Sequence, residues 1–292
     1  MASIALKTVD VFTSIPFLGN PVAVALDGSA LDAEHMQRIA RWTNLSETTF
    51  IVPVTRDGAD YHVRIFTPGG ELPFAGHPTI GTAHALLEAG MVEARDGMLV
   101  QQCAAGLVKL QVGYDREASR WIAFELPAPT ITALDAGQAA ELEAILEVAP
   151  APGAPPCLVD VGARWVVARL PDADAVLACA PDLQRMAAHD RRERHTGMVI
   201  FGPYGAGSEA AIEVRAFAPA HGVNEDPVCG SGNGALAAWL RHSGQAGAYG
   251  HSFLASQGRK LGRAGRLRLS IADDAILVGG NAVTCIDGSL RV

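Results

Sequence analysis

The stretch EDPVCGSGNGALAAWL, residues 225–240, decides how this sequence folds, because a glycine-rich turn leads directly into an apolar helical segment. Its alternating glycines let the backbone approach a ligand closely. The N–H groups that a helix start leaves unpaired, expected here from Ser231 to Gly234, favour a bound anion. Asp226 and Cys229 lie beside that point and are candidates for acid–base or nucleophilic chemistry. A helix cap with a buried cysteine and a turn aspartate explains the same pattern without any function.

A second copy of this pattern occurs in the first half of the chain. Residues 63–87 read VRIFTPGGELPFAGHPTIGTAHALL, and residues 214–240 read VRAFAPAHGVNEDPVCGSGNGALAAWL. Gly76 in the first copy corresponds to Gly230 in the second, 154 residues later. Two such halves predict one fold used twice. The two glycine-rich helix starts are then expected to face each other across the junction of the halves, where ligand sites preferentially form.

The repeat extends in both directions, which sets the fold class. GNPVAVAL at 19–26 is echoed by GARWVVARL at 162–170, and VQQCAAGLVKLQV at 100–112 is loosely matched by ASQGRKLGRAGRLRLSI at 255–271. Strands outnumber helices, with two helices expected in each half. This balance predicts the α+β class, with antiparallel sheets wrapped round or packed on helices. Two lobes are expected, 1–127 and 128–292.

Several elements are placed by local signals. Asp32 is expected to cap a helix that ends at Asn44. Beyond the glycine-rich loop of the first half, a helix is expected from Thr79 to Glu88. The last strands are expected at 276–278 and from Val283 onward, and this final segment, 283–292, is expected to return to the first lobe.

The composition describes a globular chain of 292 residues, with 49% apolar and 18% charged residues. A net charge of −8 argues against nucleic acid and anionic membranes, because both partners require a basic face. The five cysteines are far apart and contain no CxxC pair, so neither a disulfide framework nor a zinc site is indicated. With no apolar run near the length of a membrane span and no leader, we expect a cytoplasmic enzyme that binds a small molecule.

Familiar catalytic motifs match poorly. GNGALA at 232–237 fits the dinucleotide pattern G-x-G-x-x-A, but no acidic residue follows at the distance where the ribose contact is expected. Ser231, His77 and Asp226 can be read as a hydrolase triad, although the serine is better explained as an anion ligand at a helix start. His77 and His84 share a helical face but lack further ligands, so no metal is expected.

Three ordered motifs resemble the PhzF family of phenazine biosynthesis-like isomerases, which shares the diaminopimelate epimerase fold. They are LSETTFIV with Glu47, ELPFAGHPTIGTAHAL with His77, and EDPVCGSGNGAL with Asp226 and Ser231. The resemblance covers essentially the whole chain and includes the duplicated architecture. It implies a mostly antiparallel sheet or barrel around a central helix in each lobe, an active site in the cleft between the lobes, and a homodimer. It also implies an isomerase that uses neither metal nor cofactor, as in trans-2,3-dihydro-3-hydroxyanthranilate isomerase.

The resemblance also implies roles for individual residues. Glu47, expected from its local sequence at a helix-to-strand junction, is implied to carry the proton, with His77 and Asp226 as further catalytic residues. Contacts to the substrate are implied for a set of small and hydroxyl residues: Ser46, Gly76, Gly230, Ser231 and Gly232.

The sequence departs from the related epimerases and proline racemase, which carry two cysteines as opposed acid and base. One of those positions is Ala75 here, and the other is Cys229. Since Ala75 cannot transfer a proton, a single carboxylic acid on one face of the substrate is expected to catalyse an isomerisation. An amino-acid racemase or epimerase that uses Glu47 and Cys229 stays open as an alternative, as does a non-catalytic binding protein. Cys229 is then either a second acid–base group or a packing residue.

Overall fold

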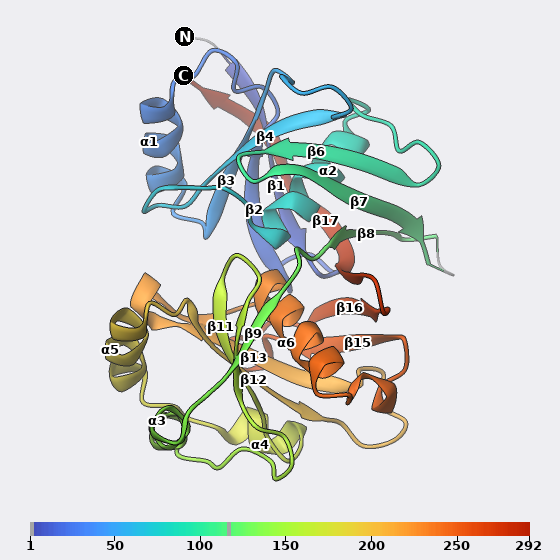
Figure 1. Ribbon diagram of the computed structural model, residues 1–292. Coiled ribbons are helices and arrows are strands. Elements are labelled where there is room, and N and C mark those ends of the chain that lie inside the picture. The colour runs from blue at the N-terminus through green and yellow to red at the C-terminus, as the bar shows by residue number, and fades with distance from the viewer. Residues whose placement is uncertain (1–2, 116–117) are drawn as a thin grey trace. The chain divides into compact units, whose positions relative to one another are not determined.

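The computed structural model describes residues 3–115 and 118–292 and divides the chain into two compact units. Unit 1 comprises Met1–Glu125 and Gly279–Val292, and unit 2 comprises Leu126–Val278. Figure 1 shows unit 1 in blue to green with the red C-terminal strand, and unit 2 in green to orange. Each unit combines one set of strands with a long buried helix, as the predicted α+β class requires.

Unit 1 contains eight strands before the chain enters unit 2, and two helices among its described residues. The strands are β1 (Ser3–Val11), β2 (Asn20–Ala25), β3 (Glu47–Val52), β4 (Tyr61–Phe66), β5 (Glu71–Leu72), β6 (Met98–Cys103), β7 (Gly106–Tyr114) and β8 (Arg120–Glu125). The helices are α1 (Ala33–Thr43) and α2 (Gly76–Glu88). Asp32 accepts a hydrogen bond from the His35 N–H, which confirms the predicted cap of α1.

The strands of unit 1 form a closed ring. Antiparallel pairs β1–β2, β3–β4, β6–β7 and β7–β8 alternate with the parallel pairs β2–β3 and β4–β6. The last strand, β17 (Ile276–Arg291), pairs with both β1 and β8 and closes the ring. A closed ring leaves none of these strands with an exposed edge.

Helix α2 fills the ring, and its burial explains its composition. Eleven consecutive residues, from Gly76 to Leu86, are buried. A helix that is surrounded by strands needs apolar or small side chains on every side. Gly81 provides the closest approach, because a Cβ atom there would lie 2.3 Å from the Val22 Cγ1 atom of β2. The absent side chain at Gly81 therefore lets α2 pack directly on β2.

Unit 2 contains more helical structure than unit 1. Its strands are β9 (Thr130–Ala133), β10 (Cys157–Asp160), β11 (Arg164–Arg169), β12 (Gly197–Pro203), β13 (Ile212–Ala218), β14 (Val223–Asp226), β15 (Ser252–Gln257) and β16 (Gly265–Ile271). Its helices are α3 (Ala136–Leu146), α4 (Ala173–Ala178), α5 (Leu183–Glu193) and α6 (Gly230–His242), with short 3-10 turns at Pro219–His221, Ala246–Ala248 and Arg259–Leu261. Helix α6 is buried along ten of its residues and packs on β10, β11, β12 and β16.

The two units repeat one pairing scheme, which confirms the predicted duplication. In unit 2, β10–β11, β12–β13 and β15–β16 are antiparallel, while β11–β12 and β13–β15 are parallel. This is the order found in unit 1 for β1–β2, β2–β3, β3–β4, β4–β6 and β6–β7. Helices α2 and α6 both have 13 residues and occupy the same place in the scheme, 154 residues apart at each end.

Three sequence-based expectations about individual elements are wrong. The final segment is a single 16-residue strand rather than two, because pairing with β1 keeps residues 282–291 extended and Asn281 bonds to the Arg120 carbonyl. Helix α2 begins at Gly76, three residues before the predicted start, since Pro78 is tolerated in a first helical turn. Unit 2 has four α-helices among its described residues rather than two.

No helix in the described part of the chain combines the length and the apolar character that crossing a bilayer requires.

The packing at Gly81 gives a stability prediction. Gly81→Ala should lower the free energy of unfolding by about 1–3 kcal/mol, because the added methyl group overpacks the contact with Val22. This loss is expected to exceed the gain of up to about 1 kcal/mol from the higher helix propensity of alanine. Gly247→Ala is the control, since a Cβ atom there meets nothing within 4 Å. Urea unfolding that finds both variants equally stable would contradict this account of the packing.

Candidate functional site

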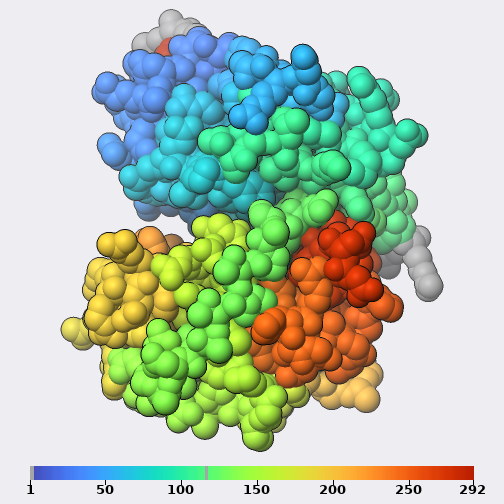
Figure 2. Space-filling view, in the orientation of Figure 1, coloured from blue at the N-terminus to red at the C-terminus, as the bar shows by residue number. Residues whose placement is uncertain are grey.

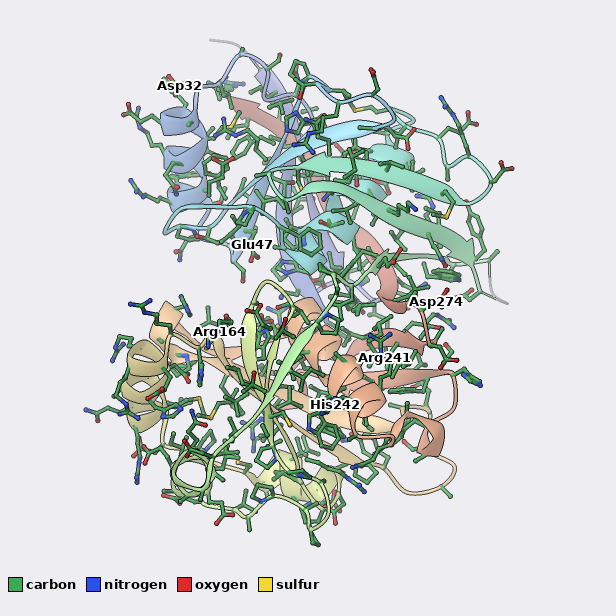
Figure 3. All side chains as sticks on the ribbon, in the orientation of Figure 1. Asp32, Glu47, Arg164, Arg241, His242 and Asp274 are labelled. Carbon is green, nitrogen blue, oxygen red and sulfur yellow. The ribbon has the colours of Figure 1, made fainter. Side chains whose placement is uncertain are left out.

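Glu47 and His77 form the central contact of unit 1. Helix α1 ends at Asn44 in a left-handed conformation, and after two further residues the chain enters β3 at Glu47, as predicted. The Glu47 Oε2 atom lies 3.1 Å from the His77 Nε2 atom, and the two side chains are only 14% and 7% exposed. Figure 3 labels Glu47 at the start of its strand. The structure thus brings together two residues that are 30 positions apart in the sequence.

The surroundings of His77 fix the protonation of its ring. His77 bonds to the backbone carbonyl of Pro21, which requires a ring N–H on the nitrogen that faces away from Glu47. Burial lowers the pKa of His77 to about 3, so the imidazole is neutral at physiological pH. A neutral ring that donates from Nδ1 carries a lone pair on Nε2. The nitrogen that faces Glu47 is therefore an acceptor.

The start of α2 offers two backbone N–H groups. Gly76 and His77 are the first two helical residues, and neither N–H group has an intrahelical acceptor. The third residue, Pro78, has no N–H group. Ala75 precedes the helix and contributes no side-chain cap. An anion at this end of α2 can therefore bind two converging donors and the positive end of the helix dipole.

Cys229 is the cap of α6. Its Sγ atom accepts a hydrogen bond of 3.3 Å from the Gly232 N–H, and its carbonyl accepts the Asn233 N–H at 3.1 Å. The expectation that N–H groups from Ser231 to Gly234 face a ligand is therefore wrong for Gly232 and Asn233. The Gly230 and Ser231 N–H groups have no acceptor among the described residues.

The two helix starts thus leave the same number of N–H groups unpaired, but for different reasons. Each leaves its first two N–H groups available, at Gly76 and His77 in α2 and at the corresponding Gly230 and Ser231 in α6. In α2, Pro78 removes the third donor, whereas in α6 the Cys229 thiol occupies it. This comparison gives the cysteine a structural role, because its counterpart Ala75 has no third N–H group to cap.

Two residues that the sequence did not single out organise the start of α6. The buried Trp165 indole donates a hydrogen bond of 3.1 Å to the Ser231 Oγ atom. The buried Gln257 side chain accepts from the Cys229 N–H at 3.1 Å and donates to the Asp226 carbonyl at 2.9 Å. For Gln257, the only sequence signal is a polar glutamine at the end of an apolar strand. Nothing in the sequence indicates the contact between Trp165 and Ser231.

Asp226 and Cys229 differ in their readiness to exchange protons. Burial raises the pKa of Asp226 to about 6, although hydrogen bonds from Cys229 and the Val228 N–H oppose the rise. Burial, reinforced by the neighbouring Asp226 charge, raises the pKa of the Cys229 thiol well above its usual range. Near neutral pH Asp226 is suited to acid–base chemistry. The thiol stays protonated, in contrast to the lowered pKa that a helix start often gives a cysteine.

The alternative uses of these residues are not supported by the contacts. A Ser–His–Asp triad requires the histidine to face the serine, but His77 Nε2 faces Glu47 and Ser231 is bonded to Trp165. His84 lies 3.9 Å from Glu88 rather than beside His77. Within residues 3–115 and 118–292, the one cluster with the spacing of metal ligands includes neither Glu47 nor Asp226.

Comparisons with known proteins show the family to which this chain belongs. The family model described as phenazine biosynthesis-like protein matches residues 9–288. Antisense-enhancing sequence 1 of Schizosaccharomyces pombe is 41% identical over 99% of both chains. Trans-2,3-dihydro-3-hydroxyanthranilate isomerase of Pseudomonas fluorescens is 36% identical over 97% of both chains.

Solved structures show the same fold. A Bacillus anthracis protein described as a phenazine biosynthesis protein of the PhzF family superposes with a TM-score of 0.86, at 25% identity over 100% of both chains. A probable proline racemase from Agrobacterium radiobacter shares the fold with a TM-score of 0.69, at 16% identity over 99% of this chain and 92% of the other. These likenesses confirm the predicted α+β fold with two lobes.

The capping role of Cys229 makes a prediction that needs no substrate. Cys229→Ala should lower the free energy of unfolding by about 1 kcal/mol or more through the lost cap, whereas Cys229→Ser should keep most of the stability because a serine hydroxyl is a good cap. Ala75→Ser in α2 is the matched comparison and should gain less than a full cap contributes, since Pro78 offers no N–H group at the third helical position. Equal stability of the alanine and serine variants in urea unfolding would show that the thiol is not a cap.

Proposed function

This chain is an isomerase of the PhzF family of phenazine biosynthesis-like proteins, and we propose that it moves a proton between two carbons of a small carboxylated substrate. In this proposal Glu47 takes the proton from one carbon and returns it to another on the same face. The relative in Pseudomonas fluorescens, named for trans-2,3-dihydro-3-hydroxyanthranilate, suggests a cyclic, amino-substituted carboxylate as the substrate class. The reaction as proposed uses the chain's own acid–base groups.

The contact between Glu47 and His77 is the observation that carries the proposal. At 3.1 Å, a neutral His77 that presents a lone pair attracts Glu47 most strongly when the carboxyl group holds a proton. We propose that Glu47, and not His77, carries the exchangeable proton of the pair. The Glu47 carboxylate takes a proton from the substrate, and the Glu47 carboxyl group then returns one. A carboxyl group that both takes up and releases a proton suits a reversible proton transfer.

The helix starts and Asp226 supply the remaining parts of the proposal. The free N–H groups of Gly76, His77, Gly230 and Ser231 are the candidate donors to the substrate carboxylate and to negative charge that develops as the C–H bond breaks. Asp226, with its pKa near 6, is the candidate partner for an amino or hydroxyl group of the substrate. Ser46 precedes Glu47 and is proposed as a further polar contact.

The state of Cys229 favours an isomerase over an epimerase. An epimerase must deliver and remove protons on opposite faces of one carbon, so a second base would be required besides Glu47. Cys229 is the candidate, but its sulfur already accepts the Gly232 N–H and its pKa is raised by burial. A protonated thiol that caps a helix is a poor base. The fold is shared with a probable proline racemase, but a shared fold alone is weaker evidence for an epimerase than these contacts are against it.

Glu47→Gln tests the proposal directly. The change keeps the size of the side chain but removes the proton that it would carry, so kcat should fall by about 100-fold or more while KM changes little. Trans-2,3-dihydro-3-hydroxyanthranilate is the first substrate to assay. Glu71→Gln is the control, because Glu71 is a more exposed glutamate of the same unit that pairs with Arg64. A Glu47→Gln enzyme with wild-type turnover would exclude Glu47 as the proton carrier.

A further inference from the structure

A second group of buried polar side chains, none of which takes part in the proposed reaction, lies at the C-terminal end of α5. His189, Asp190 and His195 are almost completely buried, with exposed fractions of 4%, 0% and 5%. One potential ligand atom of each residue lies within 4.8 Å of those of the other two. Helix α5 itself, in yellow in Figure 2, reaches the surface of unit 2. The buried cluster therefore sits beneath a helix that is accessible on its other side.

The local fold explains how a residue beyond the helix joins the cluster. Helix α5 begins at the Asp182 cap and ends at Glu193, and Arg194 then takes a left-handed conformation with φ of 57°. This turn reverses the chain, so that the His195 N–H donates to the Asp190 carbonyl at 2.9 Å. The His195 Nδ1 atom consequently lies 4.0 Å from the Asp190 Oδ1 atom. The cluster is thus a product of the helix end and not of a mobile loop.

The polar atoms of the cluster lack the partners that buried groups normally have. Neither carboxylate oxygen of Asp190 nor the Nδ1 atom of His195 has a hydrogen-bond partner within the described ranges. Neither nearby arginine hydrogen-bonds to the Asp190 carboxylate, since Arg164 donates to the carbonyls of Glu193 and Arg194, and Arg192 contacts Glu193 and His189. A buried carboxylate with no partner is costly, and most such groups in proteins are satisfied. A ligand from outside the chain can satisfy such a group.

We propose that His189, Asp190 and His195 bind one divalent transition-metal ion, with Zn²⁺ the best match. Two imidazole nitrogens and one carboxylate oxygen form a donor set that suits zinc, whereas Ca²⁺ and Mg²⁺ prefer oxygen ligands. Zinc bonds of about 2.0–2.2 Å place ligand atoms roughly 3.4 Å apart, so the side chains need to close by about 1 Å. The negative end of the α5 dipole also favours a cation at this position. A water molecule completes the coordination.

Arg192 is a competitor for this site. Its Nη2 atom lies 3.1 Å from the His189 Nδ1 atom, and because arginine can only donate, that nitrogen is an acceptor and the ring proton is on Nε2. A metal ion either takes Nδ1 itself or takes Nε2 and shifts the ring proton to Nδ1. Both routes break the contact with Arg192. Its side chain is 62% exposed, so the movement costs little.

Metal titration of the full-length protein tests this proposal without any substrate. After treatment with a chelator, the wild-type protein should bind one Zn²⁺ per chain by calorimetry and gain thermal stability. Co²⁺ should give the intense visible absorption of a low-coordinate site. Asp190→Asn and His195→Gln should each weaken Zn²⁺ binding by at least tenfold and abolish the thermal shift. Arg192→Gln should bind Zn²⁺ as tightly as the wild type or more tightly, because the competing donor is gone.

His35→Gln is the matched control, since His35 and Asp32 form an exposed pair at 2.8 Å that has no third ligand among the described residues. This variant should bind Zn²⁺ like the wild type. Circular dichroism verifies the fold of each variant, and if Asp190→Asn fails to fold, His195→Gln decides the question. The proposal is wrong if the wild type binds no stoichiometric Zn²⁺. It is equally wrong if the folded Asp190→Asn and His195→Gln variants keep the wild-type affinity, whatever the isomerase activity.

Discussion

The placement of a helix inside each set of strands is the constraint on which the rest of the structure depends. A helix that is buried on all sides cannot satisfy the N–H groups of its first turn with solvent, so these donors must meet a cap or a ligand. In α2 and α6 the third donor is removed by Pro78 or occupied by the Cys229 thiol. The first two donors of each helix are left over in both cases. The fold thus leaves two unpaired N–H groups at equivalent places in the two units, where an anion is favoured.

The equivalence of the two helix starts also shows where the units differ. The second helical residue is His77 in α2 and Ser231 in α6, and each is held by the corresponding strand, through the Pro21 carbonyl and the Trp165 indole respectively. The neutral His77 ring presents a lone pair toward Glu47, whereas the Ser231 oxygen that accepts from the indole keeps its own O–H as a donor. In the proposed reaction, the first copy of the repeat transfers the proton and the second copy binds the substrate.

The sequence was sufficient to predict the duplication, the fold class and most elements, because glycine and proline positions recur 154 residues apart and apolar periodicity marks strands reliably. It was insufficient where tertiary pairing overrides local signals. Gly279 and Gly280 suggest a turn, yet pairing with β1 and β8 keeps β17 continuous. The contact between Glu47 and His77 was not predicted, since their spacing carries no geometric information and the family resemblance implied only that both residues are catalytic. Trp165 and Gln257 were missed because their partners lie far away in the sequence.

The central claim is that one carboxyl group, Glu47, moves a proton between two carbons on one face of the substrate. The most direct measurement is the position and configuration of deuterium in the product after turnover in D₂O, determined by NMR with trans-2,3-dihydro-3-hydroxyanthranilate or another carboxylate that the enzyme converts. The account predicts a shifted double bond, hydrogen delivered to one face of the carbon that gains it, and no inversion elsewhere. Deuterium appears at that position only to the extent that the proton on Glu47 exchanges with solvent before it is returned. Inversion at a single carbon without movement of the double bond would contradict the account and identify an epimerase.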